Sequence, residues 1–330
     1  MTRPRVDVAI NVFGKPNQTA LTLLSLLRHS GHHIARIFFV ENRVATLTQR
    51  VQRFFSSRGM RSYGAIRSGS QASLLAALGE RAIFFVPRHF LWLHPLDAGR
   101  LRDEEYRHSL RYQYAWERSE QDFLFITHND CVYRKDVVGA LLDAIPGFLG
   151  AGAVGQCWNC PAGWIGTCTS AAYESYRPDL AELRTIYADS APPPKHRMRP
   201  YHIPDFLPTL RANPWPLPEC RLNEWCALID LGRARGVTAP LGPAVPFGAY
   251  WGDKRSTLDL GVEWFRQMCH GGFRFRHVAL EPFMEHLVGH AAIFDVDRYE
   301  ATEGYALEVL RREYARESAG LKLSEARASG

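Results

Sequence analysis

Apolar and polar residues alternate over residues 6–13, VDVAINVF, which is the pattern of a β-strand with one buried face. A turn containing Gly14 and Pro16 follows, and leucines at helical spacing then predict a helix that ends at Gly31. The apolar run over residues 34–40 predicts a second strand, which ends in Glu41 and Asn42. A strand, a helix and a strand in this order predict two parallel strands joined by a right-handed crossover.

The alternation of elements continues through the first half of the chain. Residues 44–80 and 103–118 have a helical pattern, whereas residues 82–86 and 123–126 are short apolar runs typical of strands. A helix over residues 137–145 and a short strand over residues 151–157 are predicted next. This order predicts an α/β fold with a doubly wound, mostly parallel central sheet and helices on both faces.

The second half of the chain is less regular. Residues 191–220 contain nine prolines, so they exclude a long helix or a central strand and predict a long loop. Such a loop is either an active-site flap or a simple surface crossing. Predicted elements around it are a helix over residues 222–232, a helix that has Asp259 in its first turn, a strand over residues 273–280, a C-terminal helix over residues 297–318 and a flexible tail over residues 319–330.

Composition narrows the class of protein. The chain of 330 residues is 46% hydrophobic and 22% charged, as in ordinary soluble proteins. Its net charge of +6 suits a phosphate-bearing ligand or peripheral contact with an anionic membrane, but no Lys/Arg block indicates nucleic acid. Seven cysteines, an odd number, argue against a disulfide scaffold and favour the cytoplasm. No signal peptide and no apolar stretch of about 18 residues is present, so no transmembrane helix is expected.

The candidate chemistry is concentrated in residues 122–131, DFLFITHNDC, where an apolar strand ends in polar groups. An acid at the end of such a strand is expected at the carboxyl edge of the sheet, where open α/β sheets bind ligands. The alternative interpretation is a simple turn, because Asn and Asp also favour turns.

Three motifs in order resemble the GT-A-fold glycosyltransferases, family 2 in particular. The second strand ends in VEN at residues 40–42, and the later strand is followed by HND at residues 128–130. The third motif lies in the C-terminal part, where Asp259 and Glu263 are followed by Gly272-Phe273, a strand, Pro282 and His286. Two features depart from the family pattern: His128 replaces the first Asp of the metal motif, and the usual Glu-Asp pair is missing.

The resemblance implies one catalytic domain over residues 1–318, with a nucleotide-sugar-binding half (1–155) and an acceptor half (156–296). It implies transfer of a sugar from a nucleotide-diphosphate donor to the hydroxyl of an unidentified acceptor. It also implies an inverting mechanism that depends on Mn²⁺ or Mg²⁺. A catalytically inactive relative and a nucleotidyltransferase remain alternatives, although a single glycine in the first turn argues against the latter.

The resemblance also implies a set of site residues. The expected metal ligands are Asp130, His128 and His286, and the base is either Asp259 or Glu263. Donor-binding positions are Val12, Phe13, Glu41, Asn42, Asn129 and Trp158.

Other candidates have an ordinary structural alternative. Trp158 either stacks on a sugar ring or fills the core, and His277 is interpreted as a packed residue. His290 is a second, less favoured ligand. Cys157 and Cys160 form a C-x-x-C pair that suits a structural zinc, but a lone pair favours buried free thiols.

Overall fold

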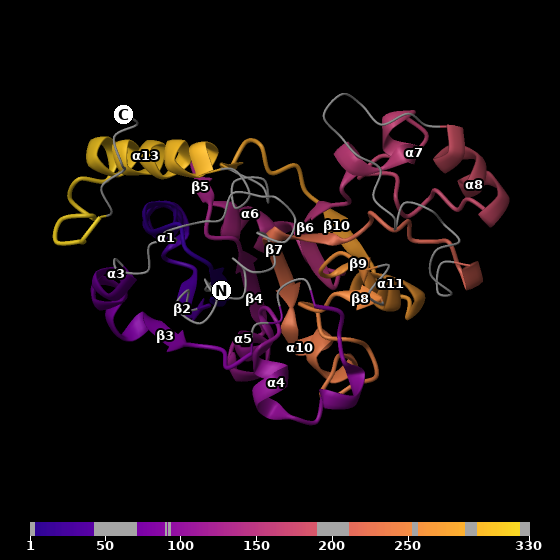
Figure 1. Cartoon of the computed structure of the whole chain (residues 1–330), viewed down its shortest axis with the longest axis horizontal. Coiled ribbons are helices and arrows are strands. Elements are labelled where there is room, and N and C mark those ends of the chain that lie inside the picture. Colours follow the sequence, from indigo (N-terminus) through magenta and orange to yellow (C-terminus); the bar gives the residue numbers. More distant parts are fainter. Residues whose placement is uncertain are drawn as a thin grey trace. The chain divides into compact units, whose positions relative to one another are not determined.

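The computed structural model describes residues 4–42, 71–89, 91, 94–189, 211–252, 257–287 and 296–323. They belong to two compact units, coloured along the sequence in Figure 1. The first unit lies within Met1–Phe90, Arg118–Ala140 and Leu280–Gly330, and the second lies within Leu91–Glu117 and Leu141–Ala279. The predicted segments 44–70, 191–210 and His290 lie outside the described residues.

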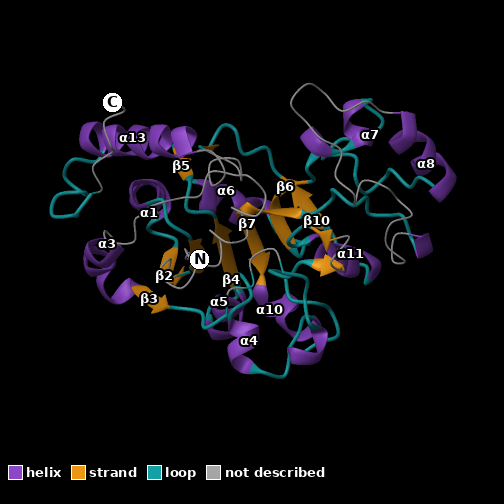
Figure 2. Cartoon of the chain, in the orientation of Figure 1, coloured by secondary structure: helices purple, strands orange, loops and turns teal. Residues whose placement is uncertain are grey.

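Seven strands form a mostly parallel sheet (Figure 2). The first unit contributes four parallel strands in the order β4 (Phe123–Thr127), β1 (Val6–Val12), β2 (Ile34–Glu41) and β3 (Ala82–Phe85). The second unit contributes β10 (Phe275–His277), β6 (Gly150–Val154) and β7 (Leu222–Asp230), of which only the β6–β7 pair is antiparallel. The predicted α/β class with a mostly parallel sheet is confirmed.

The remaining elements are helices and two small antiparallel pairs. The helices are α1 (Pro16–Ser30), α3 (Gln71–Leu78), α4 (Glu104–His108), α5 (Gln113–Arg118), α6 (Val137–Ala144), α7 (Pro161–Trp164), α8 (Leu180–Asp189), α10 (Leu231–Ala234), α11 (Val262–His270) and α13 (Val296–Glu313). The pairs are β5 (Cys131–Tyr133) with β11 (Met284–His286), and β8 (Trp251–Gly252) with β9 (Thr257–Leu258). None of the described helices combines the length and the apolar character needed to cross a membrane.

Two predicted helices are wrong. Residues 222–230 form strand β7, which is buried along most of its length, and a short buried run gives the same apolar pattern as a helix. The helix begins only at Leu231, where the Asp230 carboxylate accepts a hydrogen bond from the Arg233 amide at 3.0 Å. Residues 103–118 form two helices instead of one, because Tyr112 between them has a left-handed backbone with φ of 65°.

Helix α13 closes the first unit over the start of α1. The buried Glu303 carboxylate accepts hydrogen bonds from the backbone amides of Asn17 at 3.0 Å and Gln18 at 3.1 Å. The Tyr299 hydroxyl accepts a third from the Lys15 amide at 3.1 Å. The first amides of a helix have no partner within it, so these side chains satisfy them. The C-terminal helix therefore fixes the turn that follows β1.

Glu303 gives a pH-dependent prediction. Burial raises its pKa, and the amides of Asn17 and Gln18 offset only part of that effect. Because the folded-state pKa lies above the unfolded value of about 4.3, the contribution of Glu303 to stability is lost as the pH rises through the folded-state pKa. Glu303→Gln stays neutral, so wild type should lose stability relative to this variant above about pH 4.

Urea unfolding of both proteins across this pH range measures the difference. Glu308→Gln is the matched control, because Glu308 lies exposed on the same helix and pairs with Arg312 at 2.9 Å. It should leave the pH dependence unchanged. If the difference in the free energy of unfolding between wild type and Glu303→Gln did not change with pH, the prediction would be contradicted.

Candidate metal and donor site

The carboxyl ends of β1 and β2 bring four of the expected donor-binding residues together. Val12 and Glu41 are register partners in the parallel pair, and the Asn42 amide donates to the Val12 carbonyl at 3.0 Å. Phe13, Glu41 and Asn42 are partly exposed, whereas Val12 is buried. The edge where ligands bind in open α/β sheets is therefore lined by these residues.

The three expected metal ligands also come together, all within the first unit. Strand β11 pairs with β5 so that His286 lies opposite Cys131, next to Asp130. The Nε2 atom of His286 is 3.0 Å from Oδ1 of Asp130, and Nδ1 of His128 is 3.8 Å from the same oxygen. One ligand atom from each residue lies within 4.8 Å of the others. Asp130 is buried, and both imidazoles are partly exposed.

The sequence interpretation missed Lys15, which completes this cluster. Its ammonium lies 2.5 Å from Oδ2 of Asp130, and the two side chains are 7% and 3% exposed. Burial by itself would raise the pKa of Asp130, but the charges of Lys15 and His286 outweigh it and hold that pKa well below its usual range. Asp130 is therefore an ionised carboxylate with a resident counter-charge.

The donor set fits a divalent ion on one side of Asp130. Its Oδ1 faces the two histidines, while Oδ2 is held by Lys15. Two imidazole nitrogens and one carboxylate oxygen suit Mn²⁺ better than Mg²⁺, which prefers oxygen ligands. The neighbouring ammonium weakens the binding of a bare cation and attracts a phosphate group.

Asn129 has a supporting part in this arrangement. Its side-chain amide donates to the Gly14 carbonyl at 3.2 Å and to the Thr19 hydroxyl at 3.0 Å, and the residue is buried. These bonds join the end of β4 to the turn that carries Lys15. The expected direct contact of Asn129 with a donor stays a prediction.

The two candidate bases belong to the second unit, and their expected helical positions were wrong. Helix α11 begins at Val262 after Gly261, whose left-handed φ of 80° ends the preceding loop, so Asp259 lies before the helix. Asp259 is partly exposed, with Oδ2 3.5 Å from Nη2 of Arg221. Glu263 is the first-turn acid, and it is buried.

The surroundings of Glu263 are those of an interior carboxyl group. Burial raises its pKa, and Arg266 and Gln267 offset this only in part. Its Oε1 accepts a hydrogen bond from Nε2 of Gln267 at 2.9 Å, and Nε of Arg266 is 3.8 Å from Oε2. Of the two acids, Asp259 is the more accessible to an acceptor.

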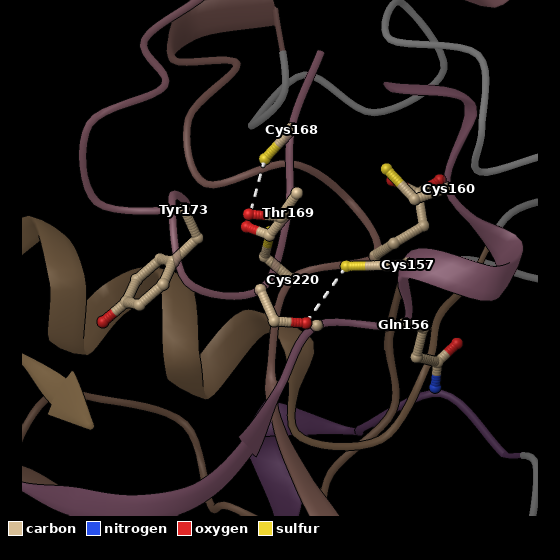
Figure 3. Close-up of a pocket in the computed structure, with 10 residues that line it drawn as sticks. Gln156, Cys157, Cys160, Cys168, Thr169, Tyr173 and Cys220 are labelled. Atoms are coloured by element: carbon tan, nitrogen blue, oxygen red, sulfur yellow. Dashed lines mark hydrogen bonds between the residues drawn. The ribbon is translucent and has the colours of Figure 1, made fainter. Parts of the chain in front are cut away.

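Four cysteines of the second unit line a small pocket together with Gln156, Thr169 and Tyr173 (Figure 3); they are Cys157, Cys160, Cys168 and Cys220. None of the seven cysteines forms a disulfide, and the Cys157 thiol contacts the Ser170 hydroxyl at 3.2 Å. Burial raises the pKa of Cys168 to about 11 and that of Cys220 well above its usual value. The groups of three or more candidate metal ligands found among the described residues contain no cysteine. Trp158, nearby in sequence, is 52% exposed and does not fill the core.

No family model and no curated protein matches the sequence. Among solved structures, the mannosyltransferase PcManGT from Pyrobaculum calidifontis, in complex with GDP-Man and Mn²⁺, aligns with 10% identity and a TM-score of 0.41. That alignment covers 95% of this chain and 66% of the mannosyltransferase. Mouse xyloside xylosyltransferase 1 in its apo form aligns with 12% identity and a TM-score of 0.38, over 84% of this chain and 86% of its own. Similarity at this level assigns no activity to the chain.

The Lys15–Asp130 pair predicts strong energetic coupling. Lys15→Met and Asp130→Asn should each destabilise the protein by about 3–5 kcal/mol, because each leaves a buried charge without its partner. The double variant should lose much less than the sum of the two, as measured by urea unfolding. Arg134→Ala breaks an exposed ion pair with Glu313 and should cost at most about 1 kcal/mol. Additive losses would show that the two charges do not stabilise each other.

Proposed function

We propose that this chain is a glycosyltransferase that moves a sugar from a nucleotide-diphosphate donor to an acceptor hydroxyl. The observation that supports it best is the cluster of Asp130, His128, His286 and Lys15 beside the carboxyl ends of parallel strands. Departure of a nucleoside diphosphate leaves negative charge on its phosphates, and this cluster offers both a metal-binding face and a fixed ammonium to stabilise it.

In this proposal Asp130, His128 and His286 hold the divalent ion, Mn²⁺ or Mg²⁺. When bound, the ion supplies Lewis-acid stabilisation of the leaving diphosphate. Lys15 neutralises Asp130 and contributes a second positive charge toward the phosphates. The partly exposed imidazoles leave the ion accessible to the donor.

The nucleotide takes the edge formed by Val12, Phe13, Glu41 and Asn42. Glu41 accepts hydrogen bonds from ribose hydroxyls, as acids at the ends of such strands do in dinucleotide-binding sheets. Asn129 keeps the Lys15 turn in place, and the exposed ring of Trp158 offers a surface on which a sugar stacks.

Asp259 is the proposed base of an inverting reaction. A carboxylate that takes the acceptor proton must be accessible and ionised. Asp259 is partly exposed beside Arg221, whereas the burial of Glu263 favours its protonated form. These surroundings support Asp259 over Glu263.

A second candidate function is supported by the Lys15–Asp130 pair itself. A lysine that neutralises the central carboxylate is also compatible with a protein that binds nucleotide sugars without metal and without transfer. Metal dependence of donor binding and turnover of the donor separate the two candidates.

The metal-binding role predicts the behaviour of His286. His286→Ala keeps the Lys15–Asp130 pair, so the fold should persist while the Mn²⁺ dependence of donor binding is lost. Calorimetry with UDP- and GDP-sugars, with and without Mn²⁺, measures this, and donor hydrolysis reports turnover. His94→Ala, an exposed histidine of the second unit, is the control. Donor affinity that is the same with and without Mn²⁺ in wild type would favour the metal-free binding protein, and absence of nucleotide binding would refute both candidates.

The proposed base predicts a separation of binding from transfer. Asp259→Asn should leave donor affinity near wild type and reduce transfer by about 10²–10⁴-fold, the usual effect of losing a general base. Glu263→Gln should reduce transfer much less. The measurement is the transfer rate with a saturating donor and an acceptor found by screening. A large loss in Glu263→Gln with none in Asp259→Asn would assign the base to Glu263.

A further inference from the structure

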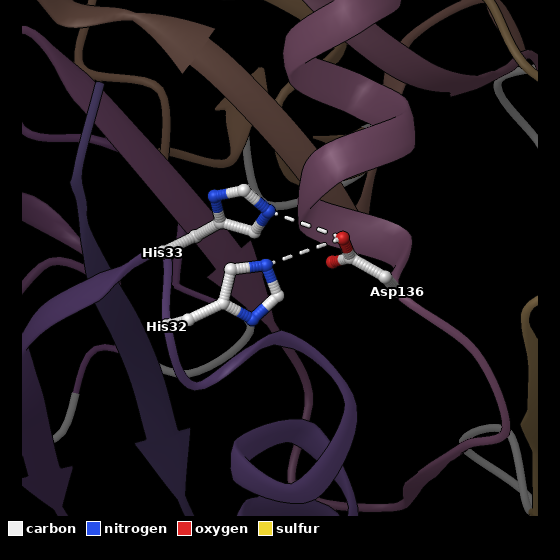
Figure 4. Close-up of side chains that lie close together, drawn as sticks. All are labelled: His32, His33 and Asp136. Atoms are coloured by element: carbon white, nitrogen blue, oxygen red, sulfur yellow. Dashed lines mark hydrogen bonds and ion pairs between the residues drawn. The ribbon is translucent and has the colours of Figure 1, made fainter. Parts of the chain in front are cut away.

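A second cluster of histidine and carboxylate groups lies in the first unit, away from Asp130. His32 and His33 occupy the turn between α1 and β2, and Asp136 directly precedes α6 (Figure 4). We propose that these three residues bind a divalent transition-metal ion of the Zn²⁺ class. The proposal does not depend on the proposed function.

The distances suit a single ion. The Nε2 atoms of His33 and His32 lie 3.1 Å and 3.7 Å from the same oxygen, Oδ2 of Asp136. In a tetrahedral zinc site with bonds of about 2.0–2.2 Å, neighbouring ligand atoms are separated by roughly 3.3–3.6 Å. One ligand atom from each of the three residues lies within 4.8 Å of the others. A small adjustment of His33 and His32 therefore places three ligands around one ion.

The carboxylate is already oriented for this role. Its other oxygen, Oδ1, accepts hydrogen bonds from the Ser30 hydroxyl at 2.7 Å and from the Gly139 amide at 3.0 Å. The backbone of His33 is held as well, since its amide donates to the Ser30 carbonyl and its carbonyl accepts from Val6. Outer hydrogen bonds of this kind orient the ligands of metal sites.

Gly139 keeps space for the Asp136 carboxylate. A Cβ at this position would collide with Oδ2 of Asp136 and crowd Nε2 of His33. Glycine inside a helix costs about 1 kcal/mol relative to alanine, so its presence in the first turn of α6 needs a local reason. The space around the shared oxygen is such a reason.

The chemistry of the donor set selects the ion. Two imidazoles and one carboxylate are common zinc ligands, and a fourth position is left for water. The His32 side chain is 66% exposed, so solvent reaches the cluster, while His33 is buried. His33 precedes β2 at the amino-terminal edge of the parallel strands, whereas Asp130 follows the carboxyl end of β4. The ion would therefore join the α1–β2 turn to α6 and stabilise the unit without entering transfer chemistry.

Isothermal titration with Zn²⁺ alone tests the site in His286→Ala, which disables the Asp130 cluster. One equivalent should bind in this background, and His286→Ala/His32→Ala should bind none. In His286→Ala/His33→Gln the glutamine amide can still donate a hydrogen bond to Asp136, but no imidazole remains at position 33. This variant should also lose Zn²⁺ binding. His286→Ala/His94→Ala is the matched control and should keep one equivalent. Co²⁺ absorption should show nitrogen and oxygen ligands in a four-coordinate site.

Absence of Zn²⁺ binding in folded His286→Ala would overturn the proposal, as would binding that survives both His32→Ala and His33→Gln. Gly139→Ala gives an independent check, because displacement of the carboxylate should weaken Zn²⁺ binding by at least tenfold. Unchanged affinity in Gly139→Ala would show that Asp136 is not a ligand. If the Asp130 cluster binds no metal, wild type itself should bind one equivalent of Zn²⁺, and His32→Ala should bind none. The test of this site can therefore be interpreted even if the proposed function is wrong.

Discussion

The buried ion pair between Lys15 and Asp130 is the interaction on which the first unit's binding edge depends. Two charges removed from water are costly unless each is paired and further hydrogen-bonded. Asp130 meets this requirement with Lys15 on one oxygen and His286 on the other. Lys15 is in turn fixed by its backbone, which is left-handed at φ of 54° and donates to Tyr299. The turn after β1 and the end of β4 are thereby held in one arrangement.

The residues that hold this pair and the turn of Lys15 in place come from the two ends of the chain. His286, Tyr299 and Glu303 belong to the C-terminal segment, while Lys15 and the start of α1 belong to the N-terminal one. The carboxyl edge of the sheet is therefore completed only when the last segment of the unit packs on the first. Loss of α13 would expose the first amides of α1, and it would also remove the hydrogen bond that holds the turn of Lys15.

The sequence predicted most of the regular elements but only part of the site. Periodicity located β1, α1, β2 and β4. The three residues that the resemblance implied as metal ligands, Asp130, His128 and His286, lie close together. Strand β7 was predicted as a helix because a short buried apolar run has no period of its own. Lys15 lies in a turn, and its partner is 115 residues away, so no local pattern marks it. The same is true of the pairing between the α1–β2 turn and Asp136.

The two histidine–carboxylate clusters share one design and differ in charge. In each, one carboxylate oxygen is held by protein donors and the other faces two imidazoles. At Asp130 the donor is the ammonium of Lys15, so the pair is formally neutral; at Asp136 the donors are a hydroxyl and an amide, so a full negative charge remains. Coulombic attraction for a bare cation is therefore greater at Asp136. The Asp130 cluster is better suited to an ion that is already bound to an anionic group. The ammonium of Lys15 repels the ion but attracts that anionic group, so its net effect on binding is less unfavourable.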